Sequence, residues 1–106
     1  MIIKYNAEIS NEAIVANLKR ITNQVYKLLP SREEGADWEK PLLTLLEELA
    51  GMDRILIGQH PTLFLLLCKL EGLFTLTAKE NFSLFRGIIF ECLGLINNLT
   101  EECQKH

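Results

Sequence analysis

The stretch "FSLFRGIIFECLGLINNLTEEC", residues 82–103, carries the most regular apolar pattern in the chain. Its apolar side chains recur at alternating spacings of three and four residues, which places them along one face of an α-helix. Just before it, Thr77 and Glu80 match a capping box, so we expect this helix to cover residues 78–104. The stripe consists of Phe82, Phe85, Ile89, Cys92, Ile96, Leu99 and Cys103.

Three further segments show the same helical spacing of apolar residues. Pro30 should stop the first of them, because a proline lacks a backbone donor and clashes with the preceding turn. Gly58 suits the left-handed position that ends the second, and Pro61 suits the first helical position of the third. We therefore expect helices over residues 11–29, 41–57 and 61–76.

The pattern as a whole predicts an all-α fold in one domain, residues 1–106. Four amphipathic helices with short connections are typical of an up-and-down four-helix bundle, in which neighbours run antiparallel. Residues 1–10 show only a weak apolar alternation. Because an isolated strand needs a partner, we expect an extended N-terminal arm that packs on the bundle or on a second chain.

Composition narrows the class of protein. Apolar residues make up 48% and charged residues 24% of the chain, as in a globular domain. The net charge of −3 comes without a basic stripe, which disfavours nucleic acid. Charged residues interrupt both of the most apolar windows, so we expect buried helices and no membrane span. The three cysteines follow no secretory signal, which favours a reducing bacterial or host-cell cytoplasm.

The third predicted helix is unusually apolar. The stretch "HPTLFLLLCKLEGLFTL", residues 60–76, carries only Lys69 and Glu71 as full charges. A helix that is apolar nearly all round must be covered nearly all round, so we expect it to be the central helix. Either the N-terminal arm and the loop over residues 30–40 cover its remaining side, or another molecule does. The fourth helix adds further apolar residues beside its main stripe. We therefore expect a second protein surface, most simply an identical chain in a twofold dimer.

Two further features mark candidate contacts. A glycine inside a helix costs about 1 kcal/mol relative to alanine, so Gly87 and Gly94 indicate either close approach of another backbone or a tolerant solvent face. Trp38 stands in a polar, acidic segment, where it is either an exposed binding anchor or a cover for the bundle end before Pro41. The interface candidates are Trp38, Phe64, Leu65, Leu84, Gly87, Ile88, Gly94 and Leu95.

The potential metal ligands are few. His60, His106 and the three cysteines show none of the spacings that zinc sites use. The cysteines lie in apolar helical segments, as buried structural thiols do. We therefore expect no metal and no cofactor.

One pair of residues resembles a catalytic motif. Arg54 and His60 are separated by five residues, which is similar to the Arg-x4-6-His motif of the HEPN family. That family comprises small all-α bundles and includes metal-independent RNases that act as dimers. The resemblance implies that Arg54 stabilises the phosphate and that His60 acts in acid/base chemistry. The chain departs from the family pattern at Ile55, where the family usually has a polar residue. The alternative is a solvated Arg54 near a helix end and a His60 that ends the turn before Pro61.

A second resemblance covers most of the chain and rests on its overall residue pattern. The segments "LLPSREEGADWEKPLLTLLEELAGMDR", "LLCKLEGL" and "FRGIIFECLGL" resemble small helical proteins carried by phages and integrative elements of Gram-positive bacteria. Such elements encode many compact proteins that act by binding, including inhibitors of host defence enzymes and regulators of the element. The resemblance implies a non-enzymatic protein-binding module, which pairs with itself or with a host protein.

Overall fold

A computed structural model shows the chain as an all-α protein, which confirms the predicted fold class. It describes residues 4–5, 11–57 and 61–104, and the side chains of residues 12–52 and 61–103. The elements in chain order are β1 (Lys4–Tyr5), α1 (Asn11–Glu33), α2 (Glu39–Ile55), β2 (Leu56–Ile57), α3 (Pro61–Gly72), the 3₁₀ turns η1 (Leu73–Thr75) and η2 (Lys79–Asn81), and α4 (Phe82–Gln104).

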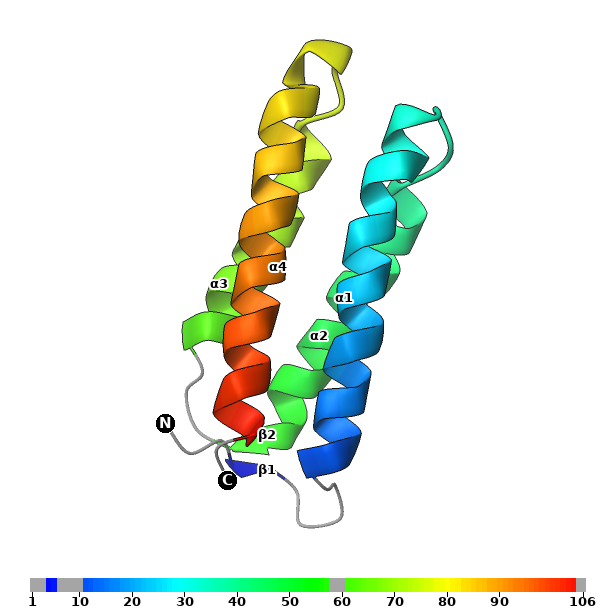
Figure 1. Cartoon of the computed structure of the whole chain (residues 1–106). Helices are drawn as coiled ribbons and strands as arrows, with labels where there is room; N and C mark the ends of the chain where they lie inside the picture. Colours follow the sequence, from blue (N-terminus) through cyan, green and yellow to red (C-terminus); the bar gives the residue numbers. More distant parts are fainter. Residues whose placement is uncertain (1–3, 6–10, 58–60, 105–106) are drawn as a thin grey trace.

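The four long helices run up and down as two hairpins, α1 with α2 and α3 with α4 (Figure 1). Both hairpin connections lie at one end of the bundle, and the start of α1 and the end of α4 lie at the other (Figure 1). The main packing partners of α1 are α2 and α4, and those of α3 are also α2 and α4. The prediction that the third helix is central is therefore wrong, because four helices around one core each keep an outer side.

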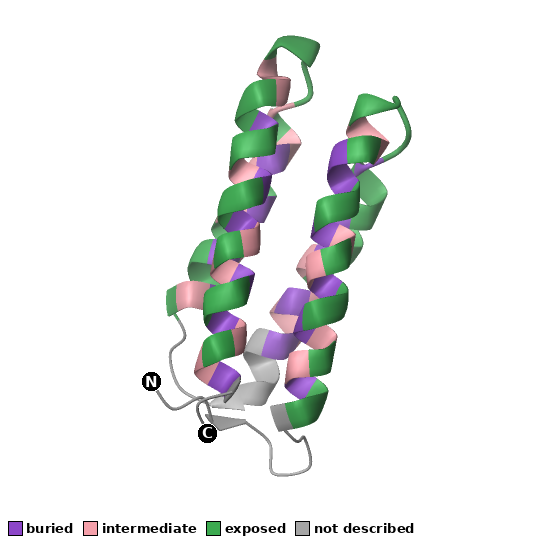
Figure 2. Cartoon of the chain, in the orientation of Figure 1, coloured by how far each residue is buried: buried purple, intermediate pink, exposed green. Residues whose placement is uncertain are grey.

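The core lies along the inner sides of all four helices, where Figure 2 shows the buried positions. Most residues of the predicted stripes are buried, which confirms the helical periodicity, although Phe82 at the start of the fourth stripe is only half-buried. Full burial of each such apolar side chain contributes about 1.5–3 kcal/mol. The core side chains on the helix stripes are Ile14, Leu18, Ile21, Val25, Leu28, Leu42, Leu45, Leu49, Met52, Leu63, Leu66, Leu70, Phe85, Ile89, Cys92, Ile96, Leu99 and Cys103.

The described part of the N-terminal arm is a short strand. Lys4 lies opposite Ile57 and Tyr5 opposite Leu56 in an antiparallel pair. The arm therefore has a partner strand in its own chain, which the sequence pattern did not predict. The pairing also explains why α2 ends at Ile55 rather than at residue 57, since β2 takes the next two residues.

α1 does not stop at Pro30, which corrects the predicted end at residue 29. The helix continues to Glu33 and carries Pro30 inside it. Beyond the proline, the Arg32 guanidinium donates hydrogen bonds of 2.7 Å to the carbonyl oxygens of Leu76 and Ala78. These long-range contacts hold the last turn of α1 in place and outweigh the local cost of the proline.

The connection between α1 and α2 is built by two residues with clear local roles. Gly35 adopts a positive φ of 77°, and the Ala36 N–H donates to the Ser31 carbonyl oxygen at 2.8 Å. This arrangement is the Schellman end of a helix. The Asp37 carboxylate then accepts from the first two backbone N–H groups of α2, at 3.1 and 3.2 Å. This cap starts α2 at Glu39, two residues before the predicted start.

The predicted capping box before the fourth helix is wrong. Ala78 caps the turn η2 and provides no side-chain hydrogen bond, and α4 begins only at Phe82. Thr77 and Glu80 have the right spacing for a capping box, but the backbone between them enters a 3₁₀ turn before the α-helix begins. The carbonyl oxygen of Ala78 is instead used by Arg32.

Candidate interaction surface on helices α3 and α4

Large apolar side chains are exposed on the outer sides of α3 and α4. On α3, the exposed fractions are 68% for Phe64 and 44% for Leu65. On α4, they are 61% for Leu84 and 46% for Phe90. Exposed apolar side chains on neighbouring helices are a common mark of an interaction site. The chain alone therefore leaves much of the predicted surface uncovered.

Two polar contacts join α3 to α4 across their common seam. The Lys69 ammonium lies 2.7 Å from the Glu91 carboxylate, and the Thr62 hydroxyl donates to Glu102 at 3.3 Å. The hydrogen bond to Glu91 raises the pKa of Lys69 above its ordinary value. Both partners of the ion pair remain partly exposed, so the pair lies at the surface and not in the core.

The register of this ion pair identifies the residues on either side of it, because α3 and α4 run antiparallel. Apolar residues are level with each other in both directions along the seam, at steps of one helical turn. We call this surface the α3–α4 face and define it by Leu65, Cys68, Lys69, Leu84, Gly87, Ile88, Glu91 and Leu95. Counted from the ion pair, Leu65 is level with Leu95, and Gly72, the last residue of α3, is level with Ile88.

The remaining interface candidates on α4 line the same surface. Ile88 and Leu95 are half-buried and pack against the core cluster, so only part of each side chain is exposed. Gly87 and Gly94 are exposed, and a Cβ atom at either position would meet nothing within 4 Å. Packing within the chain therefore does not require glycine at either position.

The sequence pattern missed Phe90, which lies on the α1 side of α4. The Arg86 guanidinium stacks 5.1 Å from the centre of its ring. Phe90 and Arg86 line an open hollow of about 330 Å³ between α1 and α4, together with Tyr26 and Phe82. Phe90 is not on the apolar stripe from Phe82 to Cys103. A phenylalanine off that stripe was the available sign that it would be exposed.

Trp38 is not an exposed anchor, which corrects its place among the interface candidates. Only 8% of its surface is exposed. Its ring meets the edge of Phe85 with centroids 5.0 Å apart and stacks with Phe74 at 6.5 Å. Arg32 stacks on the same cluster, 4.8 Å from the centre of the Phe85 ring. Trp38 therefore covers the end of the core, which was the alternative interpretation of its sequence context.

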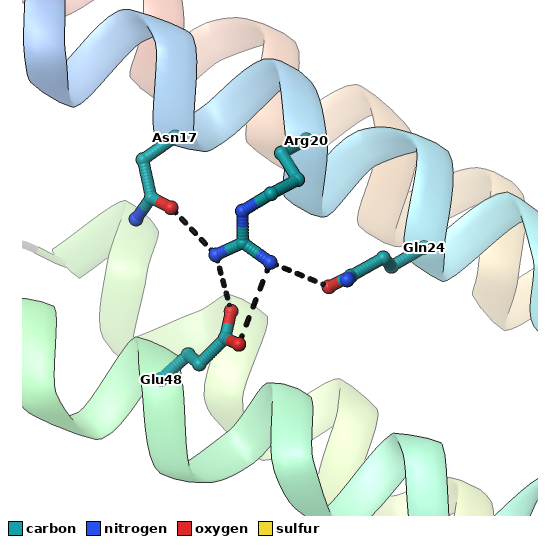
Figure 3. A network of polar contacts seen from close by, with 4 residues as sticks. All are labelled: Asn17, Arg20, Gln24 and Glu48. Carbon is teal, nitrogen blue, oxygen red and sulfur yellow. Dashed lines mark hydrogen bonds and ion pairs between the residues drawn. The ribbon is translucent and has the colours of Figure 1, made fainter.

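The opposite side of the bundle, between α1 and α2, is polar. The Arg20 guanidinium bridges to Glu48 at 2.6 Å and also donates to Asn17 and Gln24 on its own helix (Figure 3). Farther along the same side, a hollow of about 310 Å³ has a mixed lining, which includes Lys27 and Gln24 as well as Leu28 and Pro41. This side offers charged and amide groups where the α3–α4 face offers leucines.

The cysteines differ in environment. Cys92 and Cys103 are buried as predicted, whereas Cys68 is exposed on the outer side of α3. Burial raises the pKa of the Cys92 thiol to about 12 and also raises that of Cys103. Such thiols are poor nucleophiles and poor metal ligands. Within residues 4–5, 11–57 and 61–104, no group of three or more His, Cys, Asp or Glu side chains could hold a metal ion.

The residues of the HEPN-like motif lie at the edge of what the structure describes. The backbone of Arg54 belongs to α2, but its side chain is outside the described part, as is all of His60. The structure therefore does not test whether the two side chains meet. The RNase alternative stays a prediction.

By length and composition, one helical segment of the described chain, Lys79–Cys103, could cross a membrane. In the structure this segment contains α4, whose inner stripe forms part of the core. A core helix of a soluble protein meets the same criterion, so this property alone does not assign α4 to a membrane.

Comparison with known proteins gives no assignment. No family model, no curated protein and no solved structure matches the chain. Its candidate site therefore rests on its own residues.

Proposed function

We propose that this chain is a non-enzymatic helical protein-binding module that acts through the α3–α4 face. The observation that carries the proposal is the exposure of Leu65 and Leu84 on two neighbouring helices. Burying such side chains against a partner would contribute favourable free energy in proportion to the apolar area covered.

The biological setting in this proposal follows from the resemblance to small proteins of phages and integrative elements. Many of those proteins act in the bacterial cytoplasm by contact with another protein, for example as inhibitors of host defence enzymes or as regulators. A compact bundle with one apolar outer face has the form such a role requires. Identical chains and host proteins are both suitable partners for this face.

The test compares aspartate substitutions of two leucines that are both more than half exposed. Leu84→Asp alters the α3–α4 face, and Leu43→Asp alters the outer side of α2, where Leu43 is 51% exposed. Both variants should keep the helical circular dichroism of the wild type, because neither leucine belongs to the core. Each is used as bait in bacterial lysate beside the wild type. We expect Leu84→Asp to lose the specific partner and Leu43→Asp to retain it; the reverse result would contradict the proposal.

The competing enzyme hypothesis has its own test. Wild type and His60→Ala are incubated with RNA while divalent metal is chelated. We expect no cleavage by either protein. Cleavage by the wild type that His60→Ala abolishes would favour the HEPN-like RNase with Arg54 and His60.

A further inference from the structure

We infer that the partner of the α3–α4 face is a second copy of this chain, related by a twofold axis parallel to the helices, so that α3 of each copy lies against α4 of the other. The inference rests on the proposed function and names the occupant of the same face. The Cα atoms of the bundle span 44 × 19 × 19 Å, so a long side has room for an interface of the standard size, roughly 800 Å² per partner.

The charges at the centre of the face select the direction of the axis. A twofold axis along the helices places Lys69 of one copy level with Glu91 of the other, and Glu91 level with Lys69. An axis across the helices at the level of the ion pair would instead bring Lys69 to Lys69 and Glu91 to Glu91. Like charges in contact disfavour association, whereas complementary charges orient it. The two ion pairs then form one ring of alternating charges.

The apolar residues on either side agree with the same axis. Because α3 lies over α4 of the other copy at the same level, Leu65 meets the region of Leu95. Leu84 meets the segment that follows α3, which includes Leu76. Each exposed leucine is thereby covered by an apolar neighbour. Removing water from both sides of the charge ring lowers the local dielectric constant and strengthens the attraction.

The geometry also defines a pair of positions that a crosslink can report. Cys68 and Gly94 each turn away from the seam, toward the outer edge of their own helix, because Lys69 and Glu91 point into it. The register of the ion pair puts the two positions within about 3 Å of the same level. In the proposed dimer, Cys68 of one copy therefore faces Gly94 of the other, where the space beyond the glycine is open in the single chain.

The first experiment reverses the charges one at a time. Lys69→Glu and Glu91→Lys each create a copy with like charges on the face, and each should associate at least tenfold more weakly than the wild type. An equimolar mixture of the two should regain wild-type association, because each contact then joins opposite charges. Glu48→Lys is the matched control: it breaks the Arg20 ion pair on the α1–α2 side and should leave association unchanged. Wild-type association of both single variants would overturn the inference.

The second experiment tests the axis. A tagged chain that carries Cys68 is mixed with a Cys68→Ser/Gly94→Cys chain and oxidised. A disulfide requires Cα atoms about 4.4–6.8 Å apart, so we expect the mixed crosslink through position 94. Crosslinking of tagged chains to each other through Cys68, without the mixed product, would place the axis across the helices and overturn the inference.

The two proposals can fail separately. A wild type that is monomeric at tens of micromolar overturns the second-copy inference. If Leu84→Asp still loses a host protein that Leu43→Asp retains, the proposed function stands without it. If neither association nor a host partner depends on Leu84, both proposals fail.

Discussion

The α1–α2 and α3–α4 sides of the bundle each carry an interhelical ion pair, but the residues around the two pairs differ. Each side joins its two helices with one ion pair, Arg20 with Glu48 at 2.6 Å and Lys69 with Glu91 at 2.7 Å. Arg20 is surrounded by amide side chains that share its hydrogen bonds (Figure 3). Lys69 has leucine residues one turn away instead. The Arg20–Glu48 pair therefore has polar neighbours, whereas the Lys69–Glu91 pair lies at the centre of an apolar face.

The difference teaches that an ion pair has to be interpreted through its neighbours. A surface ion pair contributes about 0–1 kcal/mol to folding, so neither pair holds the bundle together. The shared core does that. The two sides differ in the free energy of exposing their surfaces to water, which is less favourable where leucines are exposed.

The largest effect should come from the core, which both sides share. Phe85 is fully buried and supports the Trp38 ring. Phe85→Ala should lower the free energy of unfolding by about 3–5 kcal/mol, because it removes an aromatic side chain and leaves a cavity. Urea unfolding followed by circular dichroism measures this. A loss below 1 kcal/mol would show that the end of the core is not packed as described.

A smaller effect should come from Cys92 on the inner side of α4, whose buried thiol makes the stability of the fold depend on pH. Burial raises the pKa of Cys92 from 9.0 to about 12, with a further increase from Glu91 that Lys69 opposes. The folded thiol therefore keeps its proton where the unfolded thiol loses it, so this stabilisation is complete below pH 9 and is lost as the pH rises toward 12.

Between pH 8 and pH 11, we expect the wild type to lose about 2–3 kcal/mol more stability than Cys92→Val. Urea unfolding of both proteins at the two pH values gives the difference. Cys103 is present in both, so its own raised pKa cancels. Parallel losses in the two proteins would mean that the Cys92 thiol is not buried from water.

The glycines of α4 provide a test that separates folding from association. Because a Cβ at Gly94 meets nothing in the single chain, Gly94→Ala should stabilise the fold by up to about 1 kcal/mol through helix propensity. In the proposed dimer the same methyl group crowds Cys68 of the other copy and weakens association. Thermal unfolding and sedimentation of one variant measure both effects. A stabilised variant that associates as well as the wild type would show that no backbone approaches this position.

The smallest effect compares the two ion pairs directly. Glu48→Gln and Glu91→Gln should each change the free energy of unfolding by less than about 1 kcal/mol, since both pairs are exposed. Only Glu91→Gln should weaken association. Equal effects of the two variants on association would remove the distinction between the two sides.

Much of the fold could be predicted because it is local and periodic. The spacing of Leu18, Leu45, Leu66 and Ile89 with their neighbours identified every core stripe before any contact was known. The errors fell where distant residues decide the outcome. Arg32 holds the turn after Pro30 through carbonyl groups 44 and 46 residues away, and no local rule anticipates that.

The candidate site was only partly predictable for the same reason. Apolar surplus on the third and fourth helices was visible in the sequence, but which residues remain exposed depends on the two neighbours that each helix acquires. Trp38 was misassigned because its partners, Phe74 and Phe85, lie far along the chain. Asp37 and Gly35 were detectable signals, an N-cap residue and a helix-ending glycine, that were outweighed by the nearby prolines.

The most direct test of the central claim is the mass of the protein in solution. Sedimentation equilibrium at tens of micromolar should give the wild type twice the 12.1 kDa of one chain and give Leu84→Asp a mass of one chain. Leu43→Asp, exposed to a similar degree on α2, should sediment as the wild type does. A wild type that sediments as a single chain, or a Leu84→Asp variant that keeps the doubled mass, would contradict self-association through the α3–α4 face.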